Sequence, residues 1–217
     1  MRKRLLFTDR AEAGRMLADR LGGLALPHPL VLALPRGGVP VGAPIATRLD
    51  APLDIVFVRK LGAPDQPELA IGAVAGGTQS QIVLNAGLVA QLGLDERYIA
   101  EAVARELDVI EQRRREWAAL RPAVEPAGRT LIVVDDGVAT GMTMQAALRQ
   151  LTQRRPARLI AAVPAASREA LGMLKGEADD VVCLSAPRRF GSVGSFYQSF
   201  LQVSDEEVTA LLREAAM

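Results

Sequence analysis

Unbroken apolar runs recur along the chain and are separated by turns and amphipathic segments. The first run, residues 30–34, leads directly into Pro-Arg-Gly-Gly. A short apolar run without polar alternation is typical of a strand that is buried on both faces of a mainly parallel sheet. Four further, mainly apolar runs predict core strands at residues 53–58, 129–134, 159–163 and 181–184, although the first contains Asp54 and the second begins with Arg129 and Thr130.

The segments between these strands carry the spacing of amphipathic helices. Asp9 with Glu12, and Ser204 with Glu207, form capping-box patterns that begin the first and last predicted helices. The longest helix is expected over residues 95–120. Its apolar face would comprise Ile99, Val103, Leu107, Ile110 and Trp117, and shorter helices are predicted at residues 39–49, 143–151 and 167–175. Because strands and helices alternate almost throughout, the sequence predicts an α/β domain with a parallel sheet.

The segment 69–94 is uncharged but lacks the pattern of a membrane-spanning helix. Residues 76–81, near its middle, are two glycines and four polar residues, whereas a spanning helix needs about 20 predominantly apolar residues. We expect a hairpin there, with strands at residues 70–75 and 81–84 joined by the Gly-Gly turn. No membrane association is predicted.

The composition excludes several classes of protein. With 217 residues, 49% of them hydrophobic, the chain is expected to form one domain over residues 1–217. The net charge of +1 disfavours nucleic-acid binding. One cysteine, Cys183, and one histidine, His28, exclude an internal disulfide and a multi-histidine metal centre. The lone cysteine and the absence of an export signal predict a cytoplasmic protein.

The segment most informative about function is residues 131–143, which reads LIVVDDGVATGMT. A four-residue apolar strand is followed by Asp135 and Asp136, at the strand end where ligands bind in open α/β sheets. A buried unpaired charge costs several kcal/mol, so we expect these carboxylates to face solvent, a metal or hydroxyl groups.

The residues after the acid pair suit a phosphate group. Residues 137–143 contain two glycines, two threonines and no acid, and they lead into a predicted helix N-terminus, where backbone N–H groups and the helix dipole bind anions. An acid pair beside such a cradle indicates a sugar phosphate whose vicinal hydroxyls donate to the carboxylates. This interpretation requires that the acids are not locked in ion pairs with neighbouring arginines. A bare strand-to-helix turn with a capping threonine is the structural alternative.

Two other phosphate-binding motifs are absent from the sequence. A Walker A loop requires GxxxxGK[ST], and Met142 stands where its lysine would be. Neither residues 37–42 nor residues 137–141 have the glycine spacing of a dinucleotide fingerprint.

Residues 131–143 closely resemble, without a gap, the 5-phosphoribosyl-1-pyrophosphate (PRPP) binding motif of the type I phosphoribosyltransferases. The resemblance implies a doubly wound, mainly parallel sheet with helices on both faces and a small hood, here formed by about 69–94 and the C-terminal segment of about 186–217. It implies that Asp135 and Asp136 hold the ribose hydroxyls. The 5′-phosphate loop would comprise Gly137, Val138, Ala139, Thr140, Gly141, Met142 and Thr143.

PRPP has two anionic ends, so a second anion site is expected at a neighbouring strand end. Pro35, Arg36, Gly37 and Gly38 resemble the pyrophosphate loop of this family, in which a cis non-proline peptide is common. The guanidinium of Arg36 would present a fork to diphosphate oxygens, and the glycines would expose backbone donors. Taken alone, these residues also fit an ordinary turn.

The next predicted strand ends in Arg59 and Lys60, and a cationic pair at that edge would face the pyrophosphate. A solvated pair of surface charges is the alternative. Residues 62–68 are expected to form a mobile loop that shields the reaction from water. The catalytic residues implied by the resemblance are Asp135, Asp136, Arg36 and Lys60.

Four of the eight aromatic residues, Phe190, Phe196, Tyr197 and Phe200, lie within eleven positions near the C-terminus. Purine-type members of the family stack the base on a C-terminal segment, so the resemblance implies that Phe196 or Tyr197 stacks on the acceptor. Phe190 and Phe200 are expected to pack in a small core instead. Ala139 stands where 6-oxopurine members have an acid, which places in doubt any transfer of their substrates to this chain.

The implied reaction displaces pyrophosphate from C1 of PRPP by a ring nitrogen of a base or related acceptor that the sequence does not identify. Mg²⁺ is the expected cofactor, held by substrate oxygens or water with Asp135 and Asp136 nearby. A homodimer is expected from the resemblance. The alternatives are a non-catalytic PRPP or nucleotide sensor, in which residues 113–115 and 154–155 would be nucleic-acid contacts, and a small phosphohydrolase that uses the same cradle.

Overall fold

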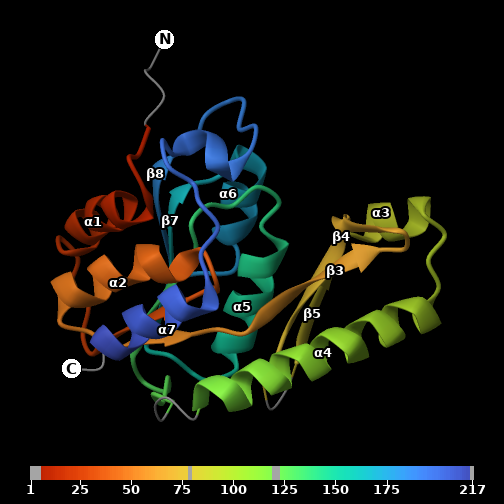
Figure 1. Ribbon diagram of the computed structural model, residues 1–217, viewed down its shortest axis with the longest axis horizontal. Helices are drawn as coiled ribbons and strands as arrows, with labels where there is room; N and C mark the ends of the chain where they lie inside the picture. The colour runs from red at the N-terminus through yellow and green to blue at the C-terminus, as the bar shows by residue number, and fades with distance from the viewer. Residues whose placement is uncertain (1–5, 78–79, 119–122, 216–217) are drawn as a thin grey trace.

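Figure 1 shows the protein as a computed structural model, which describes residues 6–77, 80–118 and 123–215. The strands of the larger sheet are β1 (Pro29–Ala33), β2 (Leu53–Ile55), β6 (Thr130–Val134), β7 (Arg158–Ala165) and β8 (Asp180–Ser185). They are parallel and lie in the order β2-β1-β6-β7-β8. A second sheet, in the order β3-β4-β5, is antiparallel and consists of β3 (Val58–Ala63), β4 (Gln66–Ala75) and β5 (Gln81–Leu84).

Helices cover both faces of the larger sheet. Those described are α1 (Arg10–Leu21), α2 (Gly38–Leu49), α3 (Ala86–Gln91), α4 (Glu96–Ala118), α5 (Met142–Thr152), α6 (Arg168–Leu174) and α7 (Asp205–Glu214). Helices α1, α2 and α7 pack on one face, and α5 and α6 pack on the other. The α/β class and the mainly parallel, doubly wound sheet predicted from the sequence are confirmed.

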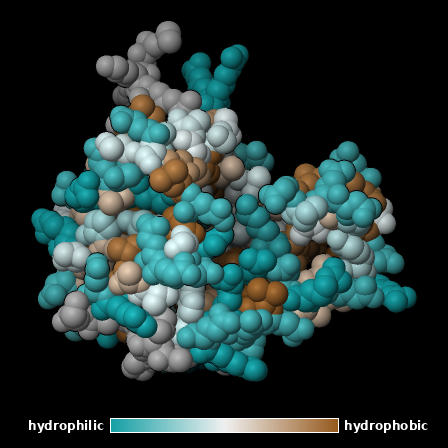
Figure 2. Space-filling view, in the orientation of Figure 1, coloured by the Kyte–Doolittle hydropathy of each residue, from teal (hydrophilic) through white to brown (hydrophobic). Residues whose placement is uncertain are grey.

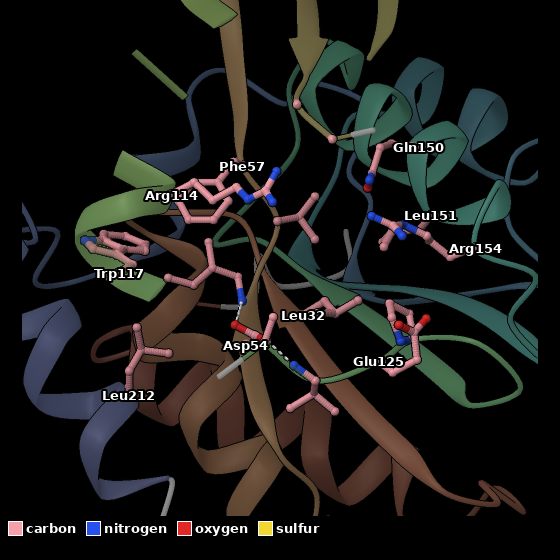
Figure 3. A pocket seen from close by; sticks show the side chains of 17 residues that line it. Leu32, Asp54, Phe57, Arg114, Trp117, Glu125, Gln150, Leu151, Arg154 and Leu212 are labelled. Carbon is pink, nitrogen blue, oxygen red and sulfur yellow. Dashed lines mark hydrogen bonds between the residues drawn. The ribbon is translucent and has the colours of Figure 1, made fainter. Parts of the chain in front are cut away.

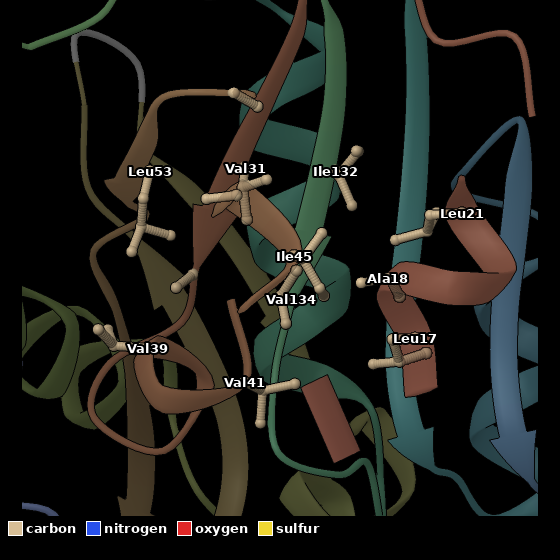
Figure 4. Close-up of a cluster of buried hydrophobic side chains, with 14 of the residues drawn as sticks. Leu17, Ala18, Leu21, Val31, Val39, Val41, Ile45, Leu53, Ile132 and Val134 are labelled. Atoms are coloured by element: carbon tan, nitrogen blue, oxygen red, sulfur yellow. The ribbon is translucent and has the colours of Figure 1, made fainter. Parts of the chain in front are cut away.

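The unbroken apolar runs form strands because both of their faces are buried. In β6, Ile132 points towards α1, α2 and α7, whereas its neighbours Leu131 and Val133 point towards α5 and α6. Alternate side chains of a strand face opposite sides of a sheet, so burial on both sides requires an apolar residue at every position. Figure 4 shows the first of these two cores, with Val31, Ile45 and Ile132 at its centre.

The small unit is built around the predicted hairpin. Strands β4 and β5 pair as expected, although β4 begins at Gln66 rather than at residue 70. Helix α4 packs across β3 and β4 through Val103 and Ile110, on the apolar face that its spacing predicted. Trp117, near the end of α4, contacts the core of the larger sheet instead, and residue 120 lies outside the described residues.

Two segments differ from the prediction. Residues 53–58 were expected to form one strand, but β2 ends at Ile55 and Val58 begins β3, which pairs with β4 in the small sheet. Val56, which connects β2 to β3, is buried. The chain therefore passes from one sheet to the other through a buried apolar residue. Residues 62–68 do not form a loop: they lie in β3, a tight turn and β4. Helix α3 was not predicted.

The two segments expected to form a hood have different surroundings. Residues 69–94 lie in the small unit, whereas α7, within residues 186–217, packs against α2 on the larger sheet. A hood composed of both segments therefore stays a prediction.

The surface is mixed in character. Figure 2 shows that hydrophilic residues predominate on the displayed face, with hydrophobic residues in small separate groups. Within the described ranges, no helix has the length and hydropathy that crossing a bilayer requires.

We expect the cap of α1 to contribute measurably to stability. The carboxylate of Asp9 accepts a hydrogen bond of 2.8 Å from the backbone N–H of Glu12, so Asp9→Ala should lower the free energy of unfolding by about 1 kcal/mol in urea denaturation. Asp19→Ala, at an exposed position of the same helix, is the control and should stay within about 0.5 kcal/mol of the wild type. Equal losses in the two variants would contradict the role of the cap.

Candidate functional site

Two loops meet at the carboxyl edge of the larger sheet, because the strands that precede them are neighbours. Strands β1 and β6 pair in parallel with Ala33 opposite Val134, so residues 35–38 lie beside residues 135–141. A Cβ on Gly38 would lie 2.6 Å from the carbonyl oxygen of Val134, and a Cβ on Gly37 would overlap the carboxylate of Asp136. Only glycine allows the two loops to approach this closely.

The acid pair is held by hydrogen bonds from the surrounding backbone and side chains. The backbone N–H of Asp136 donates to Oδ1 of Asp135 at 2.8 Å, and the hydroxyl of Tyr197 donates to the backbone carbonyl of Asp136 at 2.5 Å. Oδ2 of Asp136 accepts a third bond, from Arg10, so Oδ2 of Asp135 and Oδ1 of Asp136 have no partner among the described residues. The pair therefore presents two free carboxylate oxygens.

Asp136 has a partner that the sequence did not predict. Nε of Arg10, in the first turn of α1, donates to Oδ2 of Asp136 at 2.8 Å, and the guanidinium also bonds to the carbonyl of Leu201. The expectation that neither acid is paired with an arginine is wrong for Asp136. It is not contradicted for Asp135, which forms no ion pair with the described residues. The physical reason is burial, since a carboxylate this enclosed is stabilised by a cation.

Burial raises the pKa of both acids, and like charge adds to the rise for Asp135. Desolvation is the largest cause of the raised pKa of Asp135, followed by the negative charge of Asp136, and the pKa lies well above its ordinary value. Desolvation also raises the pKa of Asp136, while the hydrogen bond and charge of Arg10 lower it. Lys60 lowers the pKa of both, so its ammonium acts on the acid pair as expected of a residue at this site.

The loop after the acids has the geometry of an anion cradle. Gly141, with φ of 85°, adopts the left-handed conformation immediately before α5. Val138 is tied to β7 and α6, because its N–H donates to Ala165 and its carbonyl accepts from Ser167. The backbone N–H groups of residues 139–143, in contrast, have no acceptor in the described part of the chain. Free N–H groups at a helix N-terminus bind anions.

The basic residues predicted for the pyrophosphate occupy three different positions. Arg36 follows a cis peptide bond with Pro35, and its guanidinium lies 3.9 Å from the carboxylate of Asp205 at the start of α7. Lys60 acts on the acid pair through its charge, whereas Arg59, next to it in β3, forms an ion pair of 2.8 Å with Glu106 of α4. Neighbouring side chains of a strand point to opposite faces of the sheet, so Arg59 and Lys60 cannot both point into the same binding site.

A cavity of about 350 Å³ opens beside these loops. Its lining consists of Arg10, Arg36, Gly37, Asp136, Phe200, Leu201, Gln202 and Val203. A second cavity, of about 270 Å³, shares Arg36 with it and is also lined by Arg59 and Arg113. Asp136 therefore lines one cavity together with Arg10 and Arg36, and Arg36 also lines the second one.

Three of the four clustered aromatic residues are placed differently from the prediction, whereas Phe190 packs in a small core as expected. Phe196 is fully buried and packs on Phe190 with ring centroids 5.0 Å apart, and Tyr197 is buried against Phe7. Neither Phe196 nor Tyr197 can stack on a ligand. Phe200, expected in a small core, is 38% exposed and lines the 350 Å³ cavity, with the guanidinium of Arg10 3.9 Å from its ring centre. Spacing along the sequence does not show which rings of a cluster face inward.

The donor atoms near the cavity suit a metal ion only when a substrate supplies further ligands. Asp135 and Asp136 offer carboxylate oxygens, but the described residues contain no group of three or more His, Cys, Asp or Glu placed to hold a metal. Mg²⁺ prefers oxygen ligands and usually keeps several waters, so two carboxylates and a diphosphate would satisfy it.

A model of the phosphoribosyl transferase domain matches residues 10–197. The chain belongs to the phosphoribosyl transferase family. The resemblance inferred from residues 131–143 is thereby confirmed, and the matched range includes both loops and the acid pair.

Relatives of this phosphoribosyl transferase domain agree with the assignment. The "Putative phosphoribosyl transferase Rv0571c" of Mycobacterium tuberculosis strain H37Rv is 41% identical over 210 residues, which are 97% of this chain and 47% of that protein. The chain thus spans about half the length of the mycobacterial relatives that it matches. The crystal structure of TT1426 from Thermus thermophilus is 44% identical, covers 97% of this chain and 99% of its own, and has a TM-score of 0.81. AQ2163 of Aquifex aeolicus, 12% identical over 85% of this chain and 78% of its own with a TM-score of 0.52, shares the fold.

Three residues near the candidate site were missed by sequence reasoning. Arg10 lies 126 positions before Asp136, and its helix carries no ligand-binding motif. Arg113 was considered only as a nucleic-acid contact, yet its guanidinium lies 3.2 Å from Asp205, the residue that also approaches Arg36. Phe200 was assigned to a core. No local sequence signal distinguishes these three from surface or core residues.

The raised pKa of Asp135 predicts how stability depends on pH. A carboxyl whose pKa is higher in the folded state favours folding when it is protonated, so its contribution is full below about pH 4 and is lost as pH rises through the folded-state pKa. An asparagine does not ionise, so Asp135→Asn removes this loss of stability at high pH. The free energy of unfolding should rise by about 0.5–2 kcal/mol at pH 8 and change little at pH 4.

Urea denaturation at both pH values measures this effect. Asp108→Asn, at an exposed position of α4, is the control and should show no such dependence on pH. A destabilised Asp135→Asn variant at pH 8 would contradict the assignment of a strained, buried carboxylate.

Proposed function

We propose that this protein is a phosphoribosyltransferase that transfers the 5-phosphoribosyl group of PRPP to a nitrogenous base or a related acceptor and releases pyrophosphate. The observation that carries the proposal is the convergence of an acid pair, a loop of free backbone N–H groups and a glycine-arginine loop at one edge of the sheet. Each part matches one part of PRPP, namely the ribose hydroxyls, the 5′-phosphate and the pyrophosphate.

The acid pair would hold the ribose. Oδ2 of Asp135 and Oδ1 of Asp136 are the two carboxylate oxygens left free by the described partners, and vicinal ribose hydroxyls need two acceptors. The ion pair with Arg10 keeps the charge of Asp136 compensated while its second oxygen remains available. Free N–H groups of residues 139–143 would bind the 5′-phosphate at the start of α5.

The cationic side of the cavity would receive the pyrophosphate. Arg36 and Lys60 would stabilise the charge that builds on the leaving group, and the backbone of Gly37 and Gly38 would approach it closely. We add Arg113 to this group, because it lines the same cavity as Arg36. Arg59 also lines that cavity, but its ion pair with Glu106 makes it a weaker candidate.

A dissociative displacement at C1 asks little covalent chemistry of the chain's own residues. A ring nitrogen attacks as pyrophosphate leaves, so no protein nucleophile is required, and none is placed in the cavity by the described residues. Mg²⁺, held by substrate oxygens near Asp135 and Asp136, would neutralise charge on the pyrophosphate. The carboxylates would fix the ribose while the sugar becomes cationic.

The acceptor would enter beside Phe200, the one aromatic residue in the lining of the 350 Å³ cavity. Ala139, where some relatives have an acid, leaves the acceptor undefined. The homodimer and the cytoplasmic location expected from the sequence stay predictions.

A PRPP-sensing protein without turnover is the second candidate. One observation favours it: Arg10 pairs with Asp136 and Arg36 lies near Asp205, so two of the groups needed for catalysis already have partners in the chain. A sensor would bind PRPP at the same residues but would not release pyrophosphate.

Calorimetry with PRPP and Mg²⁺ tests the binding site. The double variant Asp135→Asn with Asp136→Asn should lose PRPP binding by at least a hundredfold, because amides cannot replace both charged acceptors, which corresponds to about 3 kcal/mol. Asp108→Asn should bind as the wild type does. Undiminished binding by the double variant would refute the assignment of the acid pair.

Turnover separates the two candidates. The wild type is incubated with PRPP, Mg²⁺ and a panel of purine and pyrimidine bases, and pyrophosphate release is measured. Release that depends on one base identifies the transferase and its acceptor, whereas PRPP binding without release identifies a sensor. Inorganic phosphate released without a base would indicate a phosphohydrolase.

A further inference from the structure

A cavity of about 310 Å³ lies between the larger sheet and the small unit, away from the PRPP loops. It is lined by residues of β1, β2, α4, α5 and α7 and by the chain around residues 123–126. None of the residues that line the 350 Å³ cavity belongs to it, and the 270 Å³ cavity shares only Phe57 with it, not the arginines proposed to bind pyrophosphate. The two cavities are therefore separate, and the proposed transferase function does not use this one.

One wall of this cavity is aromatic and apolar. Phe57, just after β2, and Trp117, near the end of α4, have ring centroids 5.4 Å apart at an interplanar angle of 49°. Leu32 and Leu151 form the floor between them and α5. A wall of this kind suits a flat, apolar or aromatic group.

Two arginines reach the cavity from opposite sides. Figure 3 shows Arg114 entering from α4 and Arg154 from the chain just after α5. Arg154 has no ion-pair partner among the described residues, and the only such partner of Arg114 is Glu111 of its own helix, 3.8 Å away. Two guanidinium groups facing one cavity without strong partners favour an anionic ligand.

The acids of the cavity do not neutralise these arginines. The carboxylate of Asp54 accepts hydrogen bonds from the backbone N–H groups of Ile55 at 2.9 Å and Val124 at 3.1 Å. Glu125 accepts from the N–H of Ala127 at 3.3 Å. Both carboxylates are thus engaged by the backbone, and neither lies within ion-pair distance of Arg114 or Arg154.

A buried amide supplies independent evidence for a polar ligand. Gln150 is only 8% exposed, and its side chain forms no hydrogen bond with the residues that the structure describes. In Figure 3 its amide points into the cavity, on the side of Arg154. Because the amide bonds to no described residue, its N–H and carbonyl groups are available to a polar ligand in the cavity.

We propose that this cavity binds a planar aromatic anion with the chemistry of a nucleoside monophosphate. The ring lies against Phe57 and Trp117, the anionic group lies between Arg114 and Arg154, and the amide of Gln150 bonds to a polar edge of the ring. This site is additional to the proposed PRPP site and does not depend on it.

Trp117 is the only tryptophan of the chain, so its fluorescence reports directly on this cavity. AMP and UMP are titrated separately into the full chain, with tryptophan excited on the long-wavelength side of its absorption band, where these nucleotides do not absorb. We expect saturable quenching by at least one probe. Arg154→Ala, Arg114→Ala and Gln150→Ala should each weaken that binding by about tenfold or more, which corresponds to about 1.4 kcal/mol.

Two controls make the result specific. Arg115→Ala, on the exposed side of α4 next to Arg114, should leave binding unchanged. The double variant Asp135→Asn with Asp136→Asn should keep the quenching, so that loss of the PRPP site and loss of this site are distinguishable. Three results would overturn the proposal: no saturable quenching by any probe, quenching that the three cavity variants leave unchanged, or quenching that disappears in the double aspartate variant.

Discussion

The close contact between two loops at the edge of the larger sheet is the constraint on which the site depends. Strands β1 and β6 are neighbours, and the backbone of Gly37 and Gly38 lies directly against Asp135 and Asp136. Any side chain at these glycines would separate the acids from the cations of the other loop. The register of two central strands thus determines where the ribose-binding and pyrophosphate-binding groups of the proposed transferase meet.

The same contact places the two carboxylates in an electrostatically unfavourable arrangement. Two carboxylates are buried side by side, and their pKa values are raised although Arg10 and Lys60 act in the opposite direction. Active sites commonly hold such unfavourable arrangements, which the rest of the fold stabilises. Here the stabilising elements are the two apolar cores on either face of the sheet, which fix the strand ends.

The sequence predicts the helices, strands and contiguous motifs of this fold better than it predicts the contacts between residues far apart in the chain. Buried strands and capped helices are local patterns, and the acid pair with its glycine-threonine loop is contiguous, so all of these were found. The ion pair of Arg10 with Asp136 joins positions 126 residues apart, and no local pattern encodes it. The apolar run 53–58 contains no signal that the chain changes sheet after Ile55. Likewise, four clustered aromatics do not reveal that Phe196 is buried while Phe200 faces the cavity.

A crystal structure of the protein soaked with ribose 5-phosphate tests the central claim most directly. The account predicts the phosphate at the N–H groups of residues 139–143 and the ribose hydroxyls on the free oxygens of Asp135 and Asp136, with the contact to Arg10 either kept on Oδ2 or released. An empty cavity at ligand saturation, or a sugar phosphate bound elsewhere while Arg10 and Asp136 remain paired, would contradict it.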